Sequence, residues 1–177
     1  MTLQEYFATP ETVLPQELIY GEMRVAESPT PTHQEAVGAL HIALHEHVAK
    51  RAIGSVWLSP LDVVFDAERA LVLQPDLFVI LNEGQAVVAD KVRGAPDLVI
   101  EVLSPWPRIG NVEERVGWFR EYGVRECWLL GQLDRTLRVL RFVNGTATSI
   151  REFGLDDPIE SGVLPDFRQS LGDIIGY

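Results

Sequence analysis

Residues 94–105 read GAPDLVIEVLSP, an apolar run of β-forming residues that contains two carboxylates, Asp97 and Glu101. An earlier run, QPDLFVIL at 74–81, also opens on Pro-Asp and contains Asp76. Short runs of Val, Ile, Leu and Phe bounded by Pro and Gly predict buried strands. Carboxylates are seldom fully buried unless they are paired or bind a metal ion. These acids therefore indicate a divalent-cation site. The alternative is that Asp76 and Asp97 begin their strands as turn residues and Glu101 pairs with an arginine.

Size and composition predict one globular domain. The chain has 177 residues, of which 46% are hydrophobic and 23% charged, and this length suits a single domain spanning 1–177. We expect neither a membrane span nor a signal peptide, because no apolar run is long enough and the N-terminus lacks a basic segment followed by an apolar one. The single Cys127 excludes an internal disulfide and favours a reducing, cytoplasmic location, where this residue would be a buried and inert thiol.

The net charge of −11 argues against a protein that coats nucleic acid through a broad basic surface. It does not exclude a nuclease, because a cleft that binds metal ions is itself acidic and bound cations invert the local field.

Two longer helices are predicted. Residues 33–51 carry apolar side chains at spacings of three and four, and Thr32 is the expected N-cap. Residues 111–122 repeat the same spacing, and Gly123 is expected to end that helix.

The remaining pattern predicts strands. Hairpins are expected at 17–26, turning near Gly21-Glu22, and at 136–153, where Asn144-Gly145 is typical of a type I′ turn. Further strands are expected at 55–58, 61–65, 77–81, 98–103 and 126–130. A short helix or extended arm is expected within 1–14, and a short helix at the C-terminus. The sum is an α/β domain with a mixed sheet flanked by helices, extended by N-terminal and C-terminal hairpin strands.

Six segments together resemble a known bacterial family. They are LIYGE at 18–22, Ser28-Pro29 with His33, Gln74-Pro75-Asp76, APDLVIEVLSP at 95–105, YGVRECW at 122–128 and LPDF at 164–167. The chain resembles, over nearly its whole length, the restriction-endonuclease-like family of the PD-(D/E)XK nuclease fold, long described as a domain of unknown function.

The resemblance implies a Mg²⁺ (or Mn²⁺) centre. Carried over to this chain, Asp76 is the first acid and Glu101 the second, and the backbone carbonyl of Val102 completes the protein's share of the ligands. Mg²⁺ prefers carboxylates, carbonyls and water, and it can activate water and stabilise charge on a phosphodiester. Asp97 and Glu101 lie about 13 Å apart along one strand face, so they cannot share one ion. We expect Asp97 at the strand entry or behind the ligands.

The sequence departs from the family pattern at three positions. Leu103 stands where the common fold motif has a lysine, two residues after the second acid. The resemblance implies that in this family the lysine comes from the following helix, and Arg115 stands at that position, one turn before Phe119. Arginine can hold a phosphate but stays protonated, so it cannot act as a general base. Asn111 replaces the family's usual aspartate. These changes leave metal binding feasible and put turnover in question.

The resemblance also suggests substrate-binding residues, namely His33, Glu22 and Arg108. The alternative for His33 is a structural role at the start of its helix. The alternative for Glu22 is an exposed charge in a turn, with no contact to substrate. The candidates for phosphate contacts are Arg108, Arg115, Arg120 and Arg125. The alternative is that these arginines form a solvated helix face and pair with neighbouring acids.

Two further candidates are weaker. His41 and His45 are spaced to clip a metal, but no acid or cysteine accompanies them. Trp106 could stack on a base.

Two functions remain open at this point. The first is a Mg²⁺-dependent endonuclease in which Asp76 and Glu101 bind the metal and Arg115 contacts the scissile phosphate of DNA. The second is a nuclease-fold module without turnover that binds nucleic acid or a protein. By fold analogy alone we expect a homodimer, because cutting two strands needs two sites.

Overall fold

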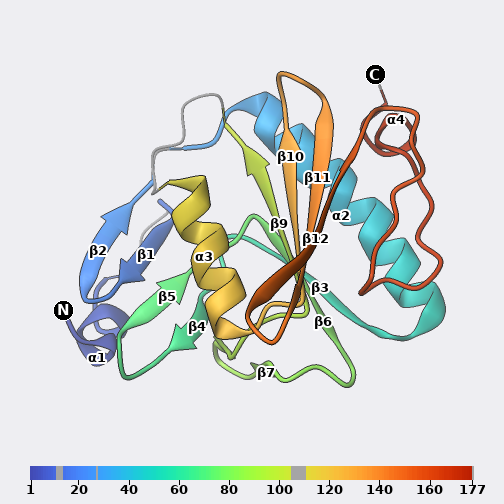
Figure 1. Cartoon of the computed structure of the whole chain (residues 1–177). Coiled ribbons are helices and arrows are strands. Elements are labelled where there is room, and N and C mark those ends of the chain that lie inside the picture. The colour runs from blue at the N-terminus through green and yellow to red at the C-terminus, as the bar shows by residue number, and fades with distance from the viewer. Residues whose placement is uncertain (11–13, 27, 105–110, 177) are drawn as a thin grey trace.

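The computed structural model describes residues 1–10, 14–26, 28–104 and 111–176, which form two mixed β-sheets and four helices (Figure 1). The larger sheet has the order β12–β11–β10–β9–β6–β3. Its strands are β3 (Gly54–Leu58), β6 (Leu77–Leu81), β9 (Leu98–Leu103), β10 (Glu126–Gly131), β11 (Thr136–Val143) and β12 (Thr146–Phe153). The smaller sheet has the order β2–β1–β5–β4–β8–β7. Its strands are β1 (Gln16–Ile19), β2 (Glu22–Val25), β4 (Val63–Asp66), β5 (Leu71–Leu73), β7 (Val87–Val88) and β8 (Val92–Arg93). The helices are α1 (Leu3–Phe7), α2 (Pro31–Arg51), α3 (Val112–Tyr122) and α4 (Leu171–Ile175).

The larger sheet is antiparallel except at its centre. Strands β9 and β10 run parallel and are joined through α3, as expected for a parallel pair, which needs a crossover connection. On the other side of β9, the antiparallel partner β6 pairs Leu77 with Ile100 and Val79 with Leu98. Continuing this register by one residue places Asp76 opposite Glu101, so the two acids predicted from the sequence meet at the same end of neighbouring strands.

Helix α2 begins directly after its N-cap residue, Thr30. The Thr30 side chain accepts a hydrogen bond from the His33 backbone N–H (3.2 Å), and Pro31 occupies the first turn, where its missing N–H costs nothing. The predicted cap, Thr32, is therefore wrong by two residues, because Thr30 is followed by a proline that suits the first helical position. The predicted apolar stripe is confirmed: Val37, Leu40, Leu44 and Val48 are buried.

Helix α3 agrees with its predicted limits. The Asn111 side chain accepts a hydrogen bond from the Glu113 N–H (2.8 Å) as N-cap. Gly123 ends the helix at φ 101°, a left-handed conformation that only glycine adopts without strain.

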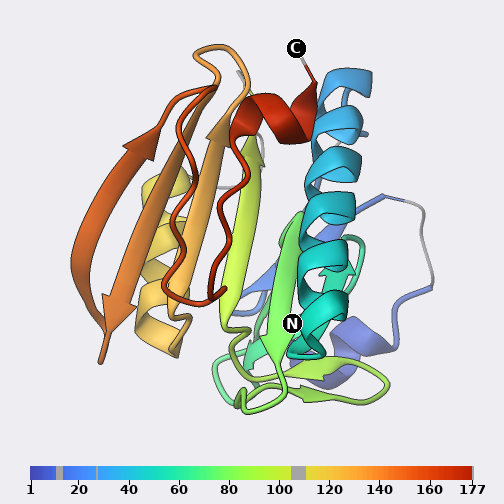
Figure 2. The same cartoon turned by 90° about the vertical axis from the view of Figure 1, so that its right-hand side faces the viewer.

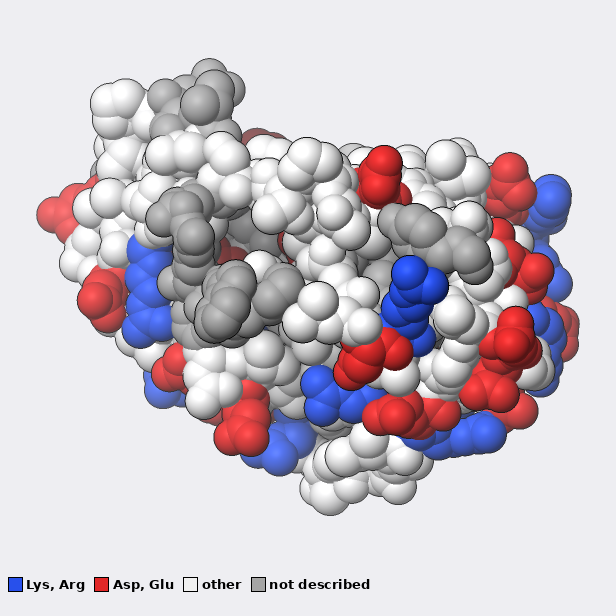
Figure 3. Space-filling view, turned by 90° about the horizontal axis from the view of Figure 1, so that it is seen from above, with Lys and Arg blue, Asp and Glu red and all other residues white. Residues whose placement is uncertain are grey.

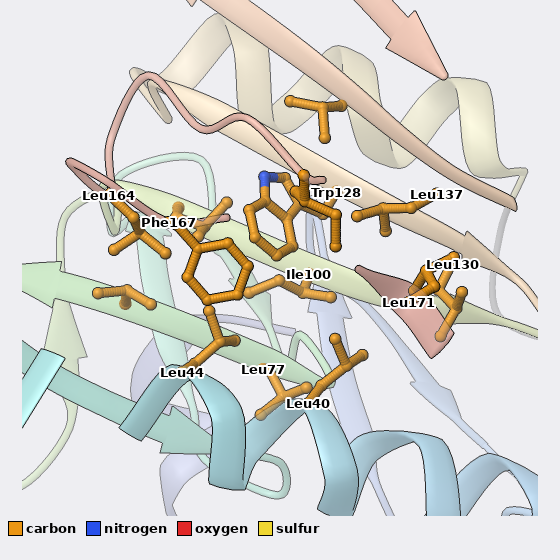
Figure 4. Close-up of a cluster of buried hydrophobic side chains, with 14 of the residues drawn as sticks. Leu40, Leu44, Leu77, Ile100, Trp128, Leu130, Leu137, Leu164, Phe167 and Leu171 are labelled. Atoms are coloured by element: carbon orange, nitrogen blue, oxygen red, sulfur yellow. The ribbon is translucent and has the colours of Figure 1, made fainter. Parts of the chain in front are cut away.

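The two helices cover opposite faces of the larger sheet (Figure 2). Alternation along β9 explains this arrangement: Leu98, Ile100 and Val102 pack in the cluster on the α2 side, whereas Val99 and Leu103 pack on the α3 side. Figure 4 shows part of the first cluster, in which Leu40, Leu44, Leu77, Ile100, Trp128, Leu130, Leu137, Leu164, Phe167 and Leu171 are labelled. Burial of these large apolar side chains is the main favourable contribution to folding.

Helix α3 also separates the two sheets. Trp118 and Phe119 pack with the smaller-sheet residues Phe65, Leu71 and Leu73 in the second cluster. The sequence predicts one mixed sheet, and the structure divides the strands between two. It also adds β5, β7 and β8, which are two or three residues long and too short for a periodic signal.

The buried thiol expected at Cys127 is confirmed on β10, and burial raises its pKa well above the usual value. Among the described residues, none of the helices has the length and hydropathy that crossing a membrane requires.

Candidate active site

A cavity of about 690 Å³ opens between the C-terminal end of β9, the N-terminal end of α2, α3 and the start of the smaller sheet. Its lining includes Glu17, His33, Asp76, Glu101 and Arg115. Seen from above, this face of the molecule is hollowed, with acidic atoms visible inside, and basic and acidic side chains alternate elsewhere on it (Figure 3). The cavity therefore gathers three carboxylates, one guanidinium and one imidazole from five separate parts of the chain.

Asp76 directly precedes β6, and its side chain is 21% exposed. Its Oδ2 atom accepts a hydrogen bond from the Val102 backbone N–H (2.8 Å) and lies 3.2 Å from Nε2 of His33. The first of these bonds ties the carboxylate to β9, beside Glu101. The second connects it to the first turn of α2, so Asp76 is oriented from two sides.

Glu101 on β9 is 14% exposed and paired with Arg115 of α3, which is 11% exposed. Nε and one terminal nitrogen of the guanidinium donate to Oε1 of Glu101, at 3.3 and 2.7 Å. The other terminal nitrogen donates to Oε2 of Glu17 at 2.6 Å. The guanidinium also lies over the Phe119 ring, 5.7 Å from its centroid, a cation–π contact that further orients it.

Burial raises the pKa of Glu101 to about 7, because the charged carboxylate loses its hydration. The positive charge of Arg115 lowers this pKa, while the neighbouring carboxylates Asp76 and Glu17 raise it. For Arg115 burial lowers the pKa, but the charges of Glu101 and Glu17 outweigh it and the net shift is upward. Arg115 is thus a permanent cation, whereas Glu101 can exchange a proton near neutral pH.

His33 is affected by opposing causes. Burial lowers the pKa of His33, but its hydrogen bond to Asp76 and the negative charges of Asp76 and Glu101 raise it more, so the net shift is upward. Its Nδ1 atom is buried without a hydrogen-bond partner among the described residues. His33 therefore lies in the cavity, as predicted, and touches the first acid.

Metal binding here would rest on few protein ligands. Within the described parts of the chain, no group of three or more His, Cys, Asp or Glu side chains is arranged to hold a metal ion. Asp76 and Glu101 supply oxygen atoms in one partly exposed cavity. A pair of carboxylates, with a carbonyl and water to complete the shell, fits a hard cation such as Mg²⁺.

Other predicted residues lie elsewhere. Glu22 on β2 is 73% exposed, pairs with Arg24 (3.5 Å) and does not line the cavity, so its substrate contact stays a prediction. Arg108 and Trp106 lie outside the described residues. Arg125 pairs with Asp97 at 3.1 Å, away from the cavity lining.

Asp97 is a structural acid. It is 5% exposed, and besides the Arg125 pair it accepts a hydrogen bond from the Leu81 backbone N–H at 2.8 Å. The strand-entry role expected for Asp97 agrees with these contacts. The rings of His41 and His45 are 5.6 Å apart, and the described residues add no further metal ligand to them.

Sequence reasoning missed Glu17. It stands one residue before the LIYGE segment, in a strand that reads QELI. The only signal in the sequence was a carboxylate in a short apolar strand, and the resemblance suggested Glu22 as the substrate-binding residue of this hairpin. What identifies Glu17 is its burial beside Arg115, a contact between residues 98 positions apart.

The comparisons with known proteins agree with the fold described above. Among solved structures, the chain is similar to the "crystal structure of a putative nuclease belonging to DUF820" from Anabaena variabilis ATCC 29413. The TM-score is 0.81 at 21% sequence identity, with 99% of this chain and 98% of that chain covered; at this identity the likeness shows the fold. A comparison with curated proteins gave no match. Residues 3–172 match the family Uma2, described as "Putative restriction endonuclease". The chain therefore belongs to the Uma2 family of restriction-endonuclease-like proteins.

Proposed function

We propose that this protein is a Mg²⁺-dependent endonuclease that hydrolyses phosphodiester bonds in DNA. The observation that carries the proposal is the meeting of Asp76 and Glu101, from adjacent strands, in a cavity where Arg115 contacts Glu101. Asp76, Glu101 and the Val102 carbonyl would hold the metal. When bound, the ion would act as a Lewis acid toward the phosphate and lower the pKa of a coordinated water.

The charges of the cavity support a cation there. Glu17, Asp76 and Glu101 can carry three negative charges against the one positive charge of Arg115, which leaves a surplus of two when His33 is neutral. A buried surplus of this kind is unfavourable and is relieved either by protonation or by a divalent cation. The raised pKa of Glu101, to about 7, is the expected response of the metal-free site.

The remaining residues would position the substrate. The hydrogen bonds from Val102 N–H and His33 hold the Asp76 carboxylate in one orientation. Of the five N–H groups of a guanidinium, the described residues engage three in Arg115, and the others are donors for a phosphate oxygen. His33 lines the same cavity and would contact the substrate beside Asp76.

The first test is calorimetric titration of Mn²⁺ into the wild type and Asp76→Asn. We expect the substitution to weaken binding at least about tenfold, since a charged oxygen ligand is lost. Asp97→Asn is the matched control, because Asp97 also precedes a strand after a proline but does not line the cavity. Equal binding by all three proteins would place the metal elsewhere and contradict the proposal.

A second candidate function is supported by Leu103. This side chain lines the cavity where the common fold motif has a lysine, and it cannot transfer a proton or contact a phosphate through hydrogen bonds. On that basis the protein is a binding module without turnover. Arg115→Lys separates the two functions in a DNA-cleavage assay with Mn²⁺. We expect turnover to persist or rise if the site is an enzyme with a modified cation, whereas inactivity of both forms together with retained DNA binding favours the module.

A further inference from the structure

Glu17 is the most buried charged group of the cavity. Its side chain is 3% exposed, and both carboxylate oxygens are in use. Oε1 accepts a hydrogen bond from the Gln74 backbone N–H at 2.8 Å, two residues before Asp76, and Oε2 accepts one from Arg115 at 2.6 Å. One carboxylate of the smaller sheet thus connects the segment that leads into Asp76 with the cation of α3.

We propose that Glu17 is a positioning residue that fixes the Arg115 guanidinium for contact with the phosphate of the substrate, an inference that rests on the function proposed above. Glu101 alone holds Arg115 from one side, through Nε and one terminal nitrogen. Glu17 holds the opposite terminal nitrogen, so the plane of the guanidinium is defined by two carboxylates. Fixing a group before the substrate arrives reduces the ordering cost at the transition state.

Glu17 matters most when Glu101 binds a metal. The Oε1 atom that now accepts two hydrogen bonds from Arg115 belongs to a predicted metal ligand, and a metal would compete with the guanidinium for its electrons. Glu17 is not among the proposed ligands, so its bond to Arg115 would be kept when a metal binds Glu101. The N-terminal hairpin therefore contributes a residue, Glu17, to the site.

A second ion pair, between Glu126 and Arg141, has a structural role away from the cavity. Glu126 is 0% exposed and accepts hydrogen bonds from Arg141 (3.1 Å), Ser161 Oγ (2.6 Å) and the Gly162 N–H (2.6 Å). These contacts anchor the C-terminal segment, and none of the four residues lines the cavity. Glu126→Gln is therefore the matched control for Glu17→Gln: both remove one charge from a buried Glu–Arg pair.

The test has two readouts on Glu17→Gln, which keeps an acceptor for the Gln74 N–H. In ¹⁵N-resolved NMR of the intact protein, the resonance of the terminal Arg115 N–H group that donates to Glu17 is expected to be sharp in the wild type and broadened by motion or solvent exchange in the variant. In DNA cleavage, kcat is expected to fall about tenfold or more, while KM and the Mn²⁺ dissociation constant change less than about threefold. Glu126→Gln should alter neither the resonance nor kcat.

Coupling to Arg115 distinguishes positioning from a general loss of structure. In an Arg115→Gln background, adding Glu17→Gln should not lower kcat further, because its effect passes through Arg115. If Glu17→Gln does not fold, Glu17→Asp, which keeps the charge but withdraws it by one methylene, gives the same readouts.

Several results would overturn the inference. An unchanged Arg115 resonance in the variant would do so, as would a large rise in the Mn²⁺ dissociation constant, which would make Glu17 a metal ligand, or additive losses in the double variant. A wild type that binds Mn²⁺ without cutting DNA would refute the proposed nuclease, while the Arg115 resonance would still decide whether Glu17 holds the guanidinium.

Discussion

In the proposed function, the chemistry of this site would depend on Arg115. Its guanidinium stands between Glu101 and Glu17, at the position where the family resemblance places a lysine. A lysine ammonium is a single mobile charge, whereas guanidinium is a planar group that two carboxylates can hold rigidly. The departure from the family pattern is thus matched by two acidic partners, which explains how a buried arginine is accommodated here.

The pH dependence of stability follows from Glu101. Its pKa is about 7 in the folded protein against an ordinary value of 4.5, so between these pH values the folded state holds a proton that the unfolded state has released. The free energy of unfolding should therefore fall as pH rises from 5 to 7, by about 2 kcal/mol. The raised pKa of His33 acts in the same direction above its usual value.

Urea unfolding at a series of pH values between 5 and 8 measures this effect. Glu101→Gln is expected to flatten the profile, whatever its effect on absolute stability, because the variant has no proton to exchange at this position. A profile for the variant as steep as that of the wild type would assign the dependence to another group.

At the scale of elements, α3 positions the cation of the site. Its N-cap, Asn111, lies four residues before Arg115, and its last turn closes on Gly123. Because Arg115 lies one turn after the N-cap, the residue that begins the helix also sets the position of the guanidinium.

Removing the cap should lower stability. Asn111→Ala deletes the acceptor for the Glu113 N–H and is expected to cost about 1 kcal/mol, measured by thermal or denaturant unfolding. Asn111→Asp is the control, because aspartate caps equally well and interacts favourably with the helix dipole. Equal destabilisation by both substitutions would mean that the cap contributes nothing.

At the scale of the molecule, the site depends on the contact between the two sheets. Glu101 lies on a strand of the larger sheet, and Asp76 directly precedes another. Glu17 lies on a strand of the smaller sheet, and α3 packs between the two sheets. Neither sheet alone assembles the cavity.

We further predict a homodimer, because cutting both strands of a duplex requires two sites. Light scattering coupled to size-exclusion chromatography should then give twice the mass of one chain. Measurement at several concentrations controls for weak association, and the mass of a single chain throughout would leave a single-site protein that nicks or binds one strand.

The sequence by itself determined the strands of four or more residues, both longer helices and the presence of Asp76 and Glu101 in apolar runs. These features are local: a period of two or 3.6 residues, Pro and Gly at the boundaries, and carboxylates within apolar runs. The resemblance that placed the two acids rests on the same short segments. The division into two sheets was not predicted, because β5, β7 and β8 of the smaller sheet are only two or three residues long and carry no periodic signal.

Only the tertiary structure decided the partners of the acids. Asp97 directly precedes β9 and Glu101 lies on it, yet the first pairs with Arg125 outside the cavity and the second with Arg115 inside it. Glu17 and Glu22 lie on the two strands of one hairpin, but Glu17 is buried in the cavity and Glu22 is exposed. Such differences arise because the packing of distant elements decides which partner each carboxylate meets and whether it stays in contact with water. Charge pairing in this protein is therefore a property of the folded chain.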